Sequence, residues 1–282
     1  MPENLRTLKG RIKTARNIAQ LAKTLEMVSV SKIRRARGLA ETVRPYAERI
    51  TALTATALRS LPADQRVHPY LAGRPAAARI LLAIGPDKGL CGPLTGNIIR
   101  RLADSVDENT LLITVGKRME APGIRLAGKR LIASFPMGAR LPSYSLVFDL
   151  VRVINERILS GEAGRLDVLY SRFVSFFSQV PTLQGVLPLD LSAPQGAPSA
   201  AGFEPGSAAL LDALLPHFLE VRLFDAVVQA FSAEHAARMV AMQNAKSNAL
   251  EIADTFTLLY NKTRQERITS EILDLANKGK KK

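Results

Sequence analysis

The carboxyl-terminal quarter of the chain constrains its fold more than any other stretch. Between Pro216 and Gly279 there is neither proline nor glycine. Apolar residues recur there at alternating steps of three and four: Met242, Ala245, Ala249, Ile252, Phe256 and Leu259. This spacing predicts one narrow helix face that packs against a second helix. About 60 unbroken residues would make a helix roughly 90 Å long, too long to be buried within one domain. We therefore expect a partner helix, with the far end extending beyond the domain or into another protein.

Residues 5–58 have the same periodicity and are the predicted partner. One stripe repeats along them: Leu8, Ile12, Ala15, Ala22, Leu25, Val28, Leu39, Val43, Tyr46, Ile50, Leu53 and Ala57. Pro45 removes one backbone hydrogen bond, so we expect a kink there. Long single-face helices at opposite ends of one chain predict an antiparallel coiled coil. The alternative is two ordinary amphipathic helices of a bundle, although bundle helices are rarely this long.

Between the terminal helices the periodicity changes to that of a small α/β domain. Short apolar runs bounded by glycine or proline predict buried strands, and longer stretches between them have helical spacing. We expect strands at 79–84, 110–115, 130–135, 166–171 and 186–189, with helices at 94–102 and 144–159. The last two strands are expected to be antiparallel neighbours. The alternation favours a mostly parallel, Rossmann-like sheet. The predicted division is a helix over 1–60, an α/β head over 61–205 and a helix over 206–282.

Composition and charge narrow the class of protein. The chain has 282 residues, an apolar share of 47% and one cysteine, Cys91. It therefore forms no internal disulfide, as is typical of a reducing compartment. No apolar run is long enough to span a bilayer, so we expect no direct membrane insertion. The basic, amphipathic start of the chain is interpreted as part of the mature helix rather than as a targeting peptide.

The net charge is +14, and cations crowd the first helix between Arg6 and Arg37, where Glu26 is the one acidic residue. The basic residues are Arg6, Lys9, Arg11, Lys13, Arg16, Lys23, Lys32, Arg34, Arg35 and Arg37. This imbalance favours an acidic partner, whether nucleic acid, anionic lipid or protein, over a merely solvated helix face. The chain has no tryptophan and few other aromatic residues to stack on bases, which weighs against nucleic acid.

A glycine-rich turn after the first predicted strand is the candidate site of the head. It contains Asp87, Lys88, Gly89 and Gly92, at the end of a strand where α/β proteins often bind ligands. Its spacing fits neither a phosphate-binding loop nor a dinucleotide-binding motif. Cys91 has no obvious base among three scattered histidines, and the chain has no metal-binding spacing. We therefore interpret this segment as a tight structural turn and expect no catalytic residue, cofactor or metal.

Four blocks in order resemble the gamma subunit of F-type ATP synthases over nearly the whole chain. They are EMVSVSK at 26–32, DKGLCG at 87–92, EHAARMVAM at 234–242 with Asn244, Ala245, Asn248 and Ala249, and YNKTRQ at 260–265 followed by ITSE at 268–271. The resemblance implies a non-catalytic rotor shaft that couples proton or sodium flow to ATP synthesis or hydrolysis. Its implied partners are the alpha and beta subunits, the epsilon subunit and the c-subunit ring. The implied location is peripheral, on the cytoplasmic face of a bacterial inner membrane.

The resemblance also implies which residues contact the beta subunits. These are Leu25, Lys32, Cys91, Arg238, Gln265, Thr269 and Glu271. The sequence departs from the family at Leu25, Pro93, Thr95 and Ala233, and its end is rich in lysine where the family has a small apolar tail. Two other hypotheses stay open: a basic coiled-coil adaptor for nucleic acid or anionic membrane, and an enzyme acting at the glycine-rich turn.

Overall fold

The computed structural model describes residues 4–61, 68–72, 77–138, 140–189 and 206–279. These form two compact units. The larger unit spans Val30–Ala237, and the smaller unit combines the described parts of residues 1–29 and 238–282. Two long helices contribute to both units, α1 (Leu5–Ser60) and α6 (Ser207–Gly279). The other elements all belong to the larger unit: α2 (Pro69–Ala72), β1 (Ala78–Ile84), α3 (Leu94–Ala103), β2 (Thr110–Val115), α4 (Lys117–Ala127), the 3-10 helix η2 (Gly128–Arg130), β3 (Leu131–Phe135), α5 (Tyr144–Leu159), β4 (Ala163–Phe173) and β5 (Gln179–Leu187).

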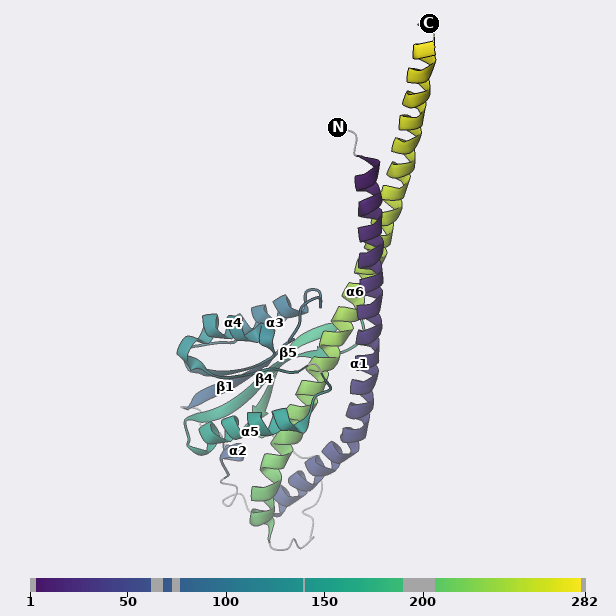
Figure 1. The fold of residues 1–282 in the computed structure, drawn as a ribbon. Coiled ribbons are helices and arrows are strands. Elements are labelled where there is room, and N and C mark those ends of the chain that lie inside the picture. Colours follow the sequence, from purple (N-terminus) through teal and green to yellow (C-terminus); the bar gives the residue numbers. More distant parts are fainter. Residues whose placement is uncertain (1–3, 62–67, 73–76, 139, 190–205, 280–282) are drawn as a thin grey trace. The chain divides into compact units, whose positions relative to one another are not determined.

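A five-stranded sheet is the centre of the larger unit, with the order β3-β2-β1-β4-β5 (Figure 1). Strand β1 pairs in parallel with β2 and β4, and β2 pairs in parallel with β3. The edge strand β5 is antiparallel to β4. Near-continuous apolar strands such as β1 are typical of parallel sheets that are covered on both faces. The predicted mostly parallel sheet and its antiparallel final pair are confirmed.

The two faces of the sheet belong to two hydrophobic cores, because successive side chains of a strand point in opposite directions. Ile80, Leu82 and Ile84 of β1 lie in the core formed with α5 and the first part of α6. Leu81 and Ala83 lie in the core formed with α3 and α4. Helices therefore cover both faces (Figure 1), as in the predicted Rossmann-like arrangement.

The predicted elements at 79–84, 94–102, 110–115, 130–135 and 144–159 nearly coincide with β1, α3, β2, β3 and α5. Three features were not predicted: the short helix α2, the helix α4 and the first part of β5. Helix α4 contains Pro122 and Gly123, which weaken a helical pattern in the sequence. A β-carbon at position 123 would lie 3.0 Å from the Thr114 side chain, so glycine lets α4 approach β2 closely. Strand β5 begins earlier than predicted, at Gln179. It contains Pro181, which an edge strand tolerates because one of its sides needs no hydrogen-bond donors.

In the smaller unit, α1 and α6 pack as an antiparallel pair. Lys246 donates a hydrogen bond of 2.8 Å to the Glu26 carboxylate. Farther along, the Arg11 guanidinium lies 5.4 Å from the centre of the Phe256 ring. From the first contact to the second, the residue number rises along α6 and falls along α1, so the two helices run antiparallel. The buried apolar residues of the seam are Leu8, Ala15, Ala19, Ala22, Met242, Ala249 and Ala253.

This seam differs in part from the predicted one. Val28, Ile252 and Leu259 were placed in it but are 47%, 49% and 40% exposed. The observed seam is built mainly from alanines, and small contact residues allow two helices to approach closely. Ile252 instead lines the side of a groove of about 510 Å³ between the helices, together with Ile18.

In the larger unit, α1 and α6 again pair. Leu53 is exposed rather than in the seam as predicted, whereas Tyr46, although 43% exposed, contacts His217 of α6. The buried positions of α1 in this unit are Ile33, Ala36, Ile50, Thr54 and Ala57. The Thr54 hydroxyl donates a hydrogen bond of 2.7 Å to the Ile50 carbonyl. Helix α1 continues through Pro45. Its part in the larger unit changes direction towards its carboxyl end (Figure 1), as expected where a proline cannot donate to the preceding turn.

Candidate functional site

The glycine-rich turn after β1 is organised by Asp87. Its Oδ1 accepts backbone N–H bonds from Lys117, at 2.9 Å, and Met137, at 3.0 Å. Its Oδ2 accepts the N–H of Gly138 at 2.8 Å. Lys117 begins α4, directly after β2, and residues 137–138 follow β3. One carboxylate thus joins the carboxyl ends of three parallel strands and satisfies an orphan donor at the start of a helix.

Two glycines allow these strand ends to meet. Gly116 has a φ of +100°, and a side chain there would collide with the Gly85 carbonyl. A side chain at Gly85 would come within 2.5 Å of the Met119 side chain. The Arg118 backbone N–H completes this contact by donating a hydrogen bond of 3.1 Å to the Pro86 carbonyl. The glycines at these strand ends therefore serve close backbone packing.

The rest of the turn alternates exposed and buried residues. Leu90 is 63% exposed and has a φ of +64°, in the left-handed region, and Gly92 follows at +56°. Cys91 is 2% exposed, and its Sγ lies 3.3 Å from the Thr95 hydroxyl and 3.9 Å from the Lys88 carbonyl. A buried thiol with these neighbours is a packing residue of the turn.

The described histidines have partners of their own. The His217 ring hydrogen-bonds Tyr46 and lies 2.7 Å from a Glu220 carboxylate oxygen. His68 and His235 make T-shaped ring contacts with Tyr70 and Phe231. Burial lowers the pKa of His68. Among the described residues, no group of three or more His, Cys, Asp or Glu side chains is arranged to hold a metal ion.

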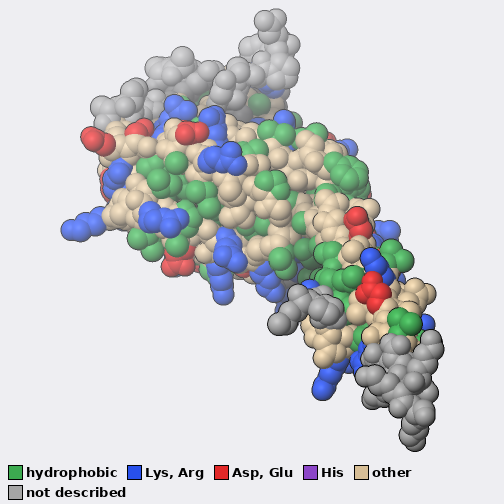
Figure 2. Space-filling view, turned by 90° about the horizontal axis from the view of Figure 1, so that it is seen from above, with side chains coloured by type: hydrophobic (Ala, Val, Ile, Leu, Met, Phe, Trp, Pro, Cys, Tyr) green, Lys and Arg blue, Asp and Glu red, His purple; other side chains and the backbone are tan. Residues whose placement is uncertain are grey.

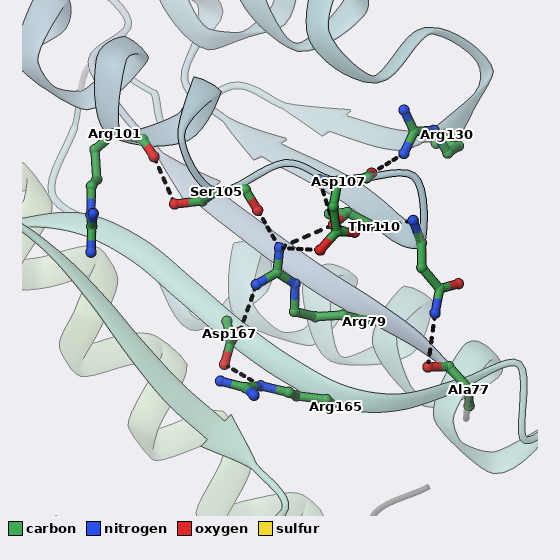
Figure 3. Close-up of polar contacts among 10 residues, drawn as sticks. Ala77, Arg79, Arg101, Ser105, Asp107, Thr110, Arg130, Arg165 and Asp167 are labelled. Carbon is green, nitrogen blue, oxygen red and sulfur yellow. Dashed lines mark hydrogen bonds and ion pairs between the residues drawn. The ribbon is translucent and has the colours of Figure 1, made fainter. Parts of the chain in front are cut away.

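A second polar cluster, which the sequence did not single out, lies at the opposite, amino-terminal edge of the strands (Figure 3). Arg79 of β1 is its centre. Its guanidinium lies 3.4 Å from Asp167 of β4 and 3.3 Å from Asp107. It also donates a hydrogen bond of 3.1 Å to the Thr110 hydroxyl. Asp167 has no exposed side-chain surface, and its second carboxylate oxygen accepts a hydrogen bond of 3.0 Å from Arg165. The Thr110 hydrogen bond, with Arg79 and Arg130 nearby, lowers the pKa of Asp107.

This cluster ties strands together rather than forming a vacant site. Each carboxylate oxygen that faces Arg79 is engaged by a guanidinium or a hydroxyl group. The signal available in the sequence was one acidic residue, Asp167, inside the otherwise apolar stretch 166–170 of β4. A charge at such a position requires a partner in the folded chain.

The carboxyl-terminal turns of α6 form an exposed surface in the smaller unit. Every residue from 264 to 273 is exposed, including Ile268, Ile272 and Leu273. The Thr269 hydroxyl donates a hydrogen bond of 2.9 Å to the Gln265 carbonyl, and the Arg267 guanidinium lies 3.0 Å from the Glu271 carboxylate. Apolar side chains exposed together on a well-formed helix indicate a surface that a partner covers.

The residues predicted to contact a partner fall into three groups by exposure. Gln265, Thr269 and Glu271 are exposed on α6, whereas Leu25 and Lys32 of α1 are half-buried. Cys91 and Arg238 are 2% and 7% exposed, so other parts of the chain cover them. The structure brings Asp87, Lys88, Gly89 and Gly92 together in one turn, with Cys91. Gln265, Thr269 and Glu271 share the distal turns of α6.

Positive charge is spread widely over the surface. In Figure 2, Lys and Arg side chains are scattered across the visible face among hydrophobic patches, with few Asp or Glu side chains between them. Exposed basic residues of α1 include Arg6, Lys9, Lys13, Arg16, Lys23, Arg34, Arg35 and Arg37. None of the described helices has an apolar stretch long enough to cross a bilayer.

Comparison with known proteins gives consistent matches over nearly the full length. A family model described as "ATP synthase" matches residues 4–277. An ATP synthase gamma chain from Dehalococcoides mccartyi is 39% identical over 278 residues, covering 96% of each chain. The corresponding chain of Roseiflexus castenholzii is 35% identical over 283 residues, with the same coverage.

Solved structures show the same fold at lower sequence identity. A chain of the Euglena gracilis mitochondrial ATP synthase, from an OSCP/F1/c-ring structure, has a TM-score of 0.70 and 18% identity, covering 97% of this chain and 93% of that one. A chain from the Tetrahymena thermophila mitochondrial ATP synthase, in its central stalk and c-ring, has a TM-score of 0.61 and 18% identity. It covers 80% of this chain and 99% of that one.

Proposed function

Because the chain belongs to the ATP synthase gamma-chain family, we propose that it is a rotor that couples ion flow through a membrane ring to ATP synthesis or hydrolysis. The reaction itself takes place on the alpha and beta subunits, and this chain contributes no catalytic group. Its further partners are the epsilon subunit and the c-subunit ring. It acts as a peripheral protein on the cytoplasmic face of a bacterial membrane. The coupling ion is a proton or sodium ion.

The observation that carries this proposal is the exposed surface on the last turns of α6. The polar residues Gln265, Thr269 and Glu271 alternate there with Ile268 and Ile272. A surface of this mixed kind supports contacts that form and break, because polar groups regain water when a contact opens. We assign partner contacts to Gln265, Thr269 and Glu271, together with Leu25 and Lys32, which remain partly accessible on α1.

Burial changes the roles proposed for two other residues. Cys91 and Arg238 are covered by the chain itself. We propose that they support the partner-contacting surface from within. A partner would reach them only after the chain had opened locally.

The test is reconstitution. The isolated chain is expected to hydrolyse no ATP, and addition to its cognate alpha and beta subunits should give fast, cooperative hydrolysis. The double variant Ile268→Ser/Ile272→Ser should keep the melting temperature of the isolated chain, because both side chains are exposed, but should weaken assembly or turnover. A matched control is Leu159→Ser, an exposed leucine at the end of α5.

Two results would contradict the proposal. Hydrolysis by the purified chain would favour an enzyme. Failure to stimulate the alpha and beta subunits, together with binding to generic DNA or anionic vesicles that falls steeply with salt, would favour a basic adaptor.

A further inference from the structure

A groove of about 750 Å³ lies between α1 and α6 within the larger unit. This larger-unit groove is lined by residues between 40 and 59 of α1 and between 218 and 229 of α6. Its apolar wall on α6 is formed by Phe218, Val221, Phe224 and Val228. Ligand pockets in proteins typically have volumes of about 300–1,000 Å³ and apolar walls with a few polar groups. The groove therefore has the size and the lining of a site for a small, largely apolar ligand.

The basic residues that line the groove already have partners within the chain. Arg44 lies 3.6 Å from the Glu48 carboxylate. The Arg222 guanidinium lies 5.1 Å from the centre of the Phe218 ring. Arg59 donates a hydrogen bond of 3.1 Å to a threonine hydroxyl one turn earlier on α1. These cations are therefore engaged before any ligand arrives.

Two carboxylates of the groove, one on each helix, are available to a ligand. Glu41 of α1 and Asp225 of α6 are both exposed, and among the described residues neither takes part in an ion pair. The Asp225 carboxylate is hydrogen-bonded to the neutral Gln229 side chain. Desolvation in the groove raises the pKa of Asp225, and the nearby Arg222 offsets this effect only in part. A cation bound beside Asp225 would favour its ionised form.

We propose that the larger-unit groove binds an amphiphilic amine, with the apolar body of the ligand against the α6 wall and its ammonium group at Asp225. Glu41 on the other helix adds to the attraction for a cation. A ligand in the groove touches both helices, so its binding stabilises their packing. This inference goes beyond the proposed rotor function and does not depend on it.

The first experiment compares two probes of equal chain length and opposite charge on the full chain. Decylammonium and decanoate are titrated by calorimetry below their micelle-forming concentrations. The chain has a net charge of +14, so non-specific attraction favours the anion, and a preference for the cation has to arise from a local site. Decylammonium should bind about tenfold more tightly than decanoate. Equal or tighter binding of decanoate would overturn the proposal.

The second experiment locates the bound amine. Asp225→Asn should weaken decylammonium binding about tenfold, because it removes a charged acceptor and keeps the side-chain shape. The matched control is Asp149→Asn, which changes a carboxylate of α5 outside the groove whose side chain is 52% exposed, and it should leave the affinity unchanged. Ala52→Phe places a ring in the groove from an exposed position of α1 and should abolish binding.

Melting temperatures of these variants should match that of the wild-type chain, because all three positions are exposed. Undiminished affinity of the folded Asp225→Asn chain for decylammonium would show that the amine binds elsewhere.

A third measurement separates a small ligand from a protein occupant. In a complex reconstituted with alpha, beta and epsilon subunits, the decylammonium binding that depends on an open groove is the difference between the wild-type and Ala52→Phe complexes. This binding should persist. Its loss on assembly would overturn the proposal and assign the groove to a subunit contact. Failure of the chain to stimulate the alpha and beta subunits would contradict the rotor proposal alone, because the first two experiments use the isolated chain.

Discussion

At the scale of single residues, Asp167 should matter more for stability than any exposed ion pair. Its carboxylate is completely buried between Arg79 and Arg165. Asp167→Ala would leave the Arg79 charge without its buried partner, and breaking a buried pair in this way costs about 3–5 kcal/mol. Glu162→Ala is the control, since its pair with Arg157 is substantially exposed and such pairs contribute about 1 kcal/mol or less. Urea unfolding of both variants measures the difference, and similar losses would contradict this account.

The hydrogen bonds of Asp87 and the backbone conformation of Leu90 were not predictable from the sequence. The three donors to Asp87 lie 30, 50 and 51 positions away along the chain, so they become neighbours only when three strands are aligned. The positive φ of Leu90 likewise has no local signal, because leucine normally avoids it. What the sequence did indicate was a structural turn rather than a nucleotide site, through glycine spacing that fits no phosphate-binding pattern.

At the scale of elements, the helix pair of the smaller unit depends on alanine packing. Ala253 is 1% exposed, whereas the neighbouring Ile252 is 49% exposed. Ala253→Asp would bury an unpaired charge between the helices and should cost roughly 3 kcal/mol or more. Ile252→Asp, next to it on the groove side, should cost under ~1 kcal/mol. Circular dichroism melts and amide exchange in residues 5–29 compare them, and a larger loss at Ile252 would restore the seam that the sequence predicted.

Element types were predictable and the seam was predictable only in part, for one physical reason. Periodicity fixes the type of element, because a period of about 3.6 or 2 is a property of the local chain. It fixes a seam less well, because large apolar residues dominate the pattern while small ones allow the closest packing. Ala19, Ser29 and Ala253 are buried. Val28, next to Ser29, and Ile252, next to Ala253, are exposed. Helix α4 was missed because Pro122 and Gly123 interrupt its local signal, although the sheet supplies the packing that stabilises it.

At the scale of the whole molecule, a rotor differs from an adaptor because it must move relative to its partners. Covalent attachment to one partner tests this directly. Cys91, the sole cysteine, is unsuitable for the attachment because it is 2% exposed. The exposed Lys88 in the same turn is the better position. The variant Lys88→Cys/Cys91→Ser removes the native thiol, and serine retains a hydroxyl group for the contact with Thr95.

A cysteine in a loop of the beta subunit should form a disulfide with the cysteine at position 88 if the two Cα atoms come within about 7 Å. The disulfide would fix the chain to one of the beta subunits, so multi-site ATP turnover should fall to the level of the fraction that is not cross-linked. Reduction should restore turnover, since thiol–disulfide exchange is reversible. The same complex with serine at position 88 is the control and should be insensitive to oxidation. A fully cross-linked complex, verified on a non-reducing gel, that retained its turnover would show that the chain works while fixed in place, as an adaptor does.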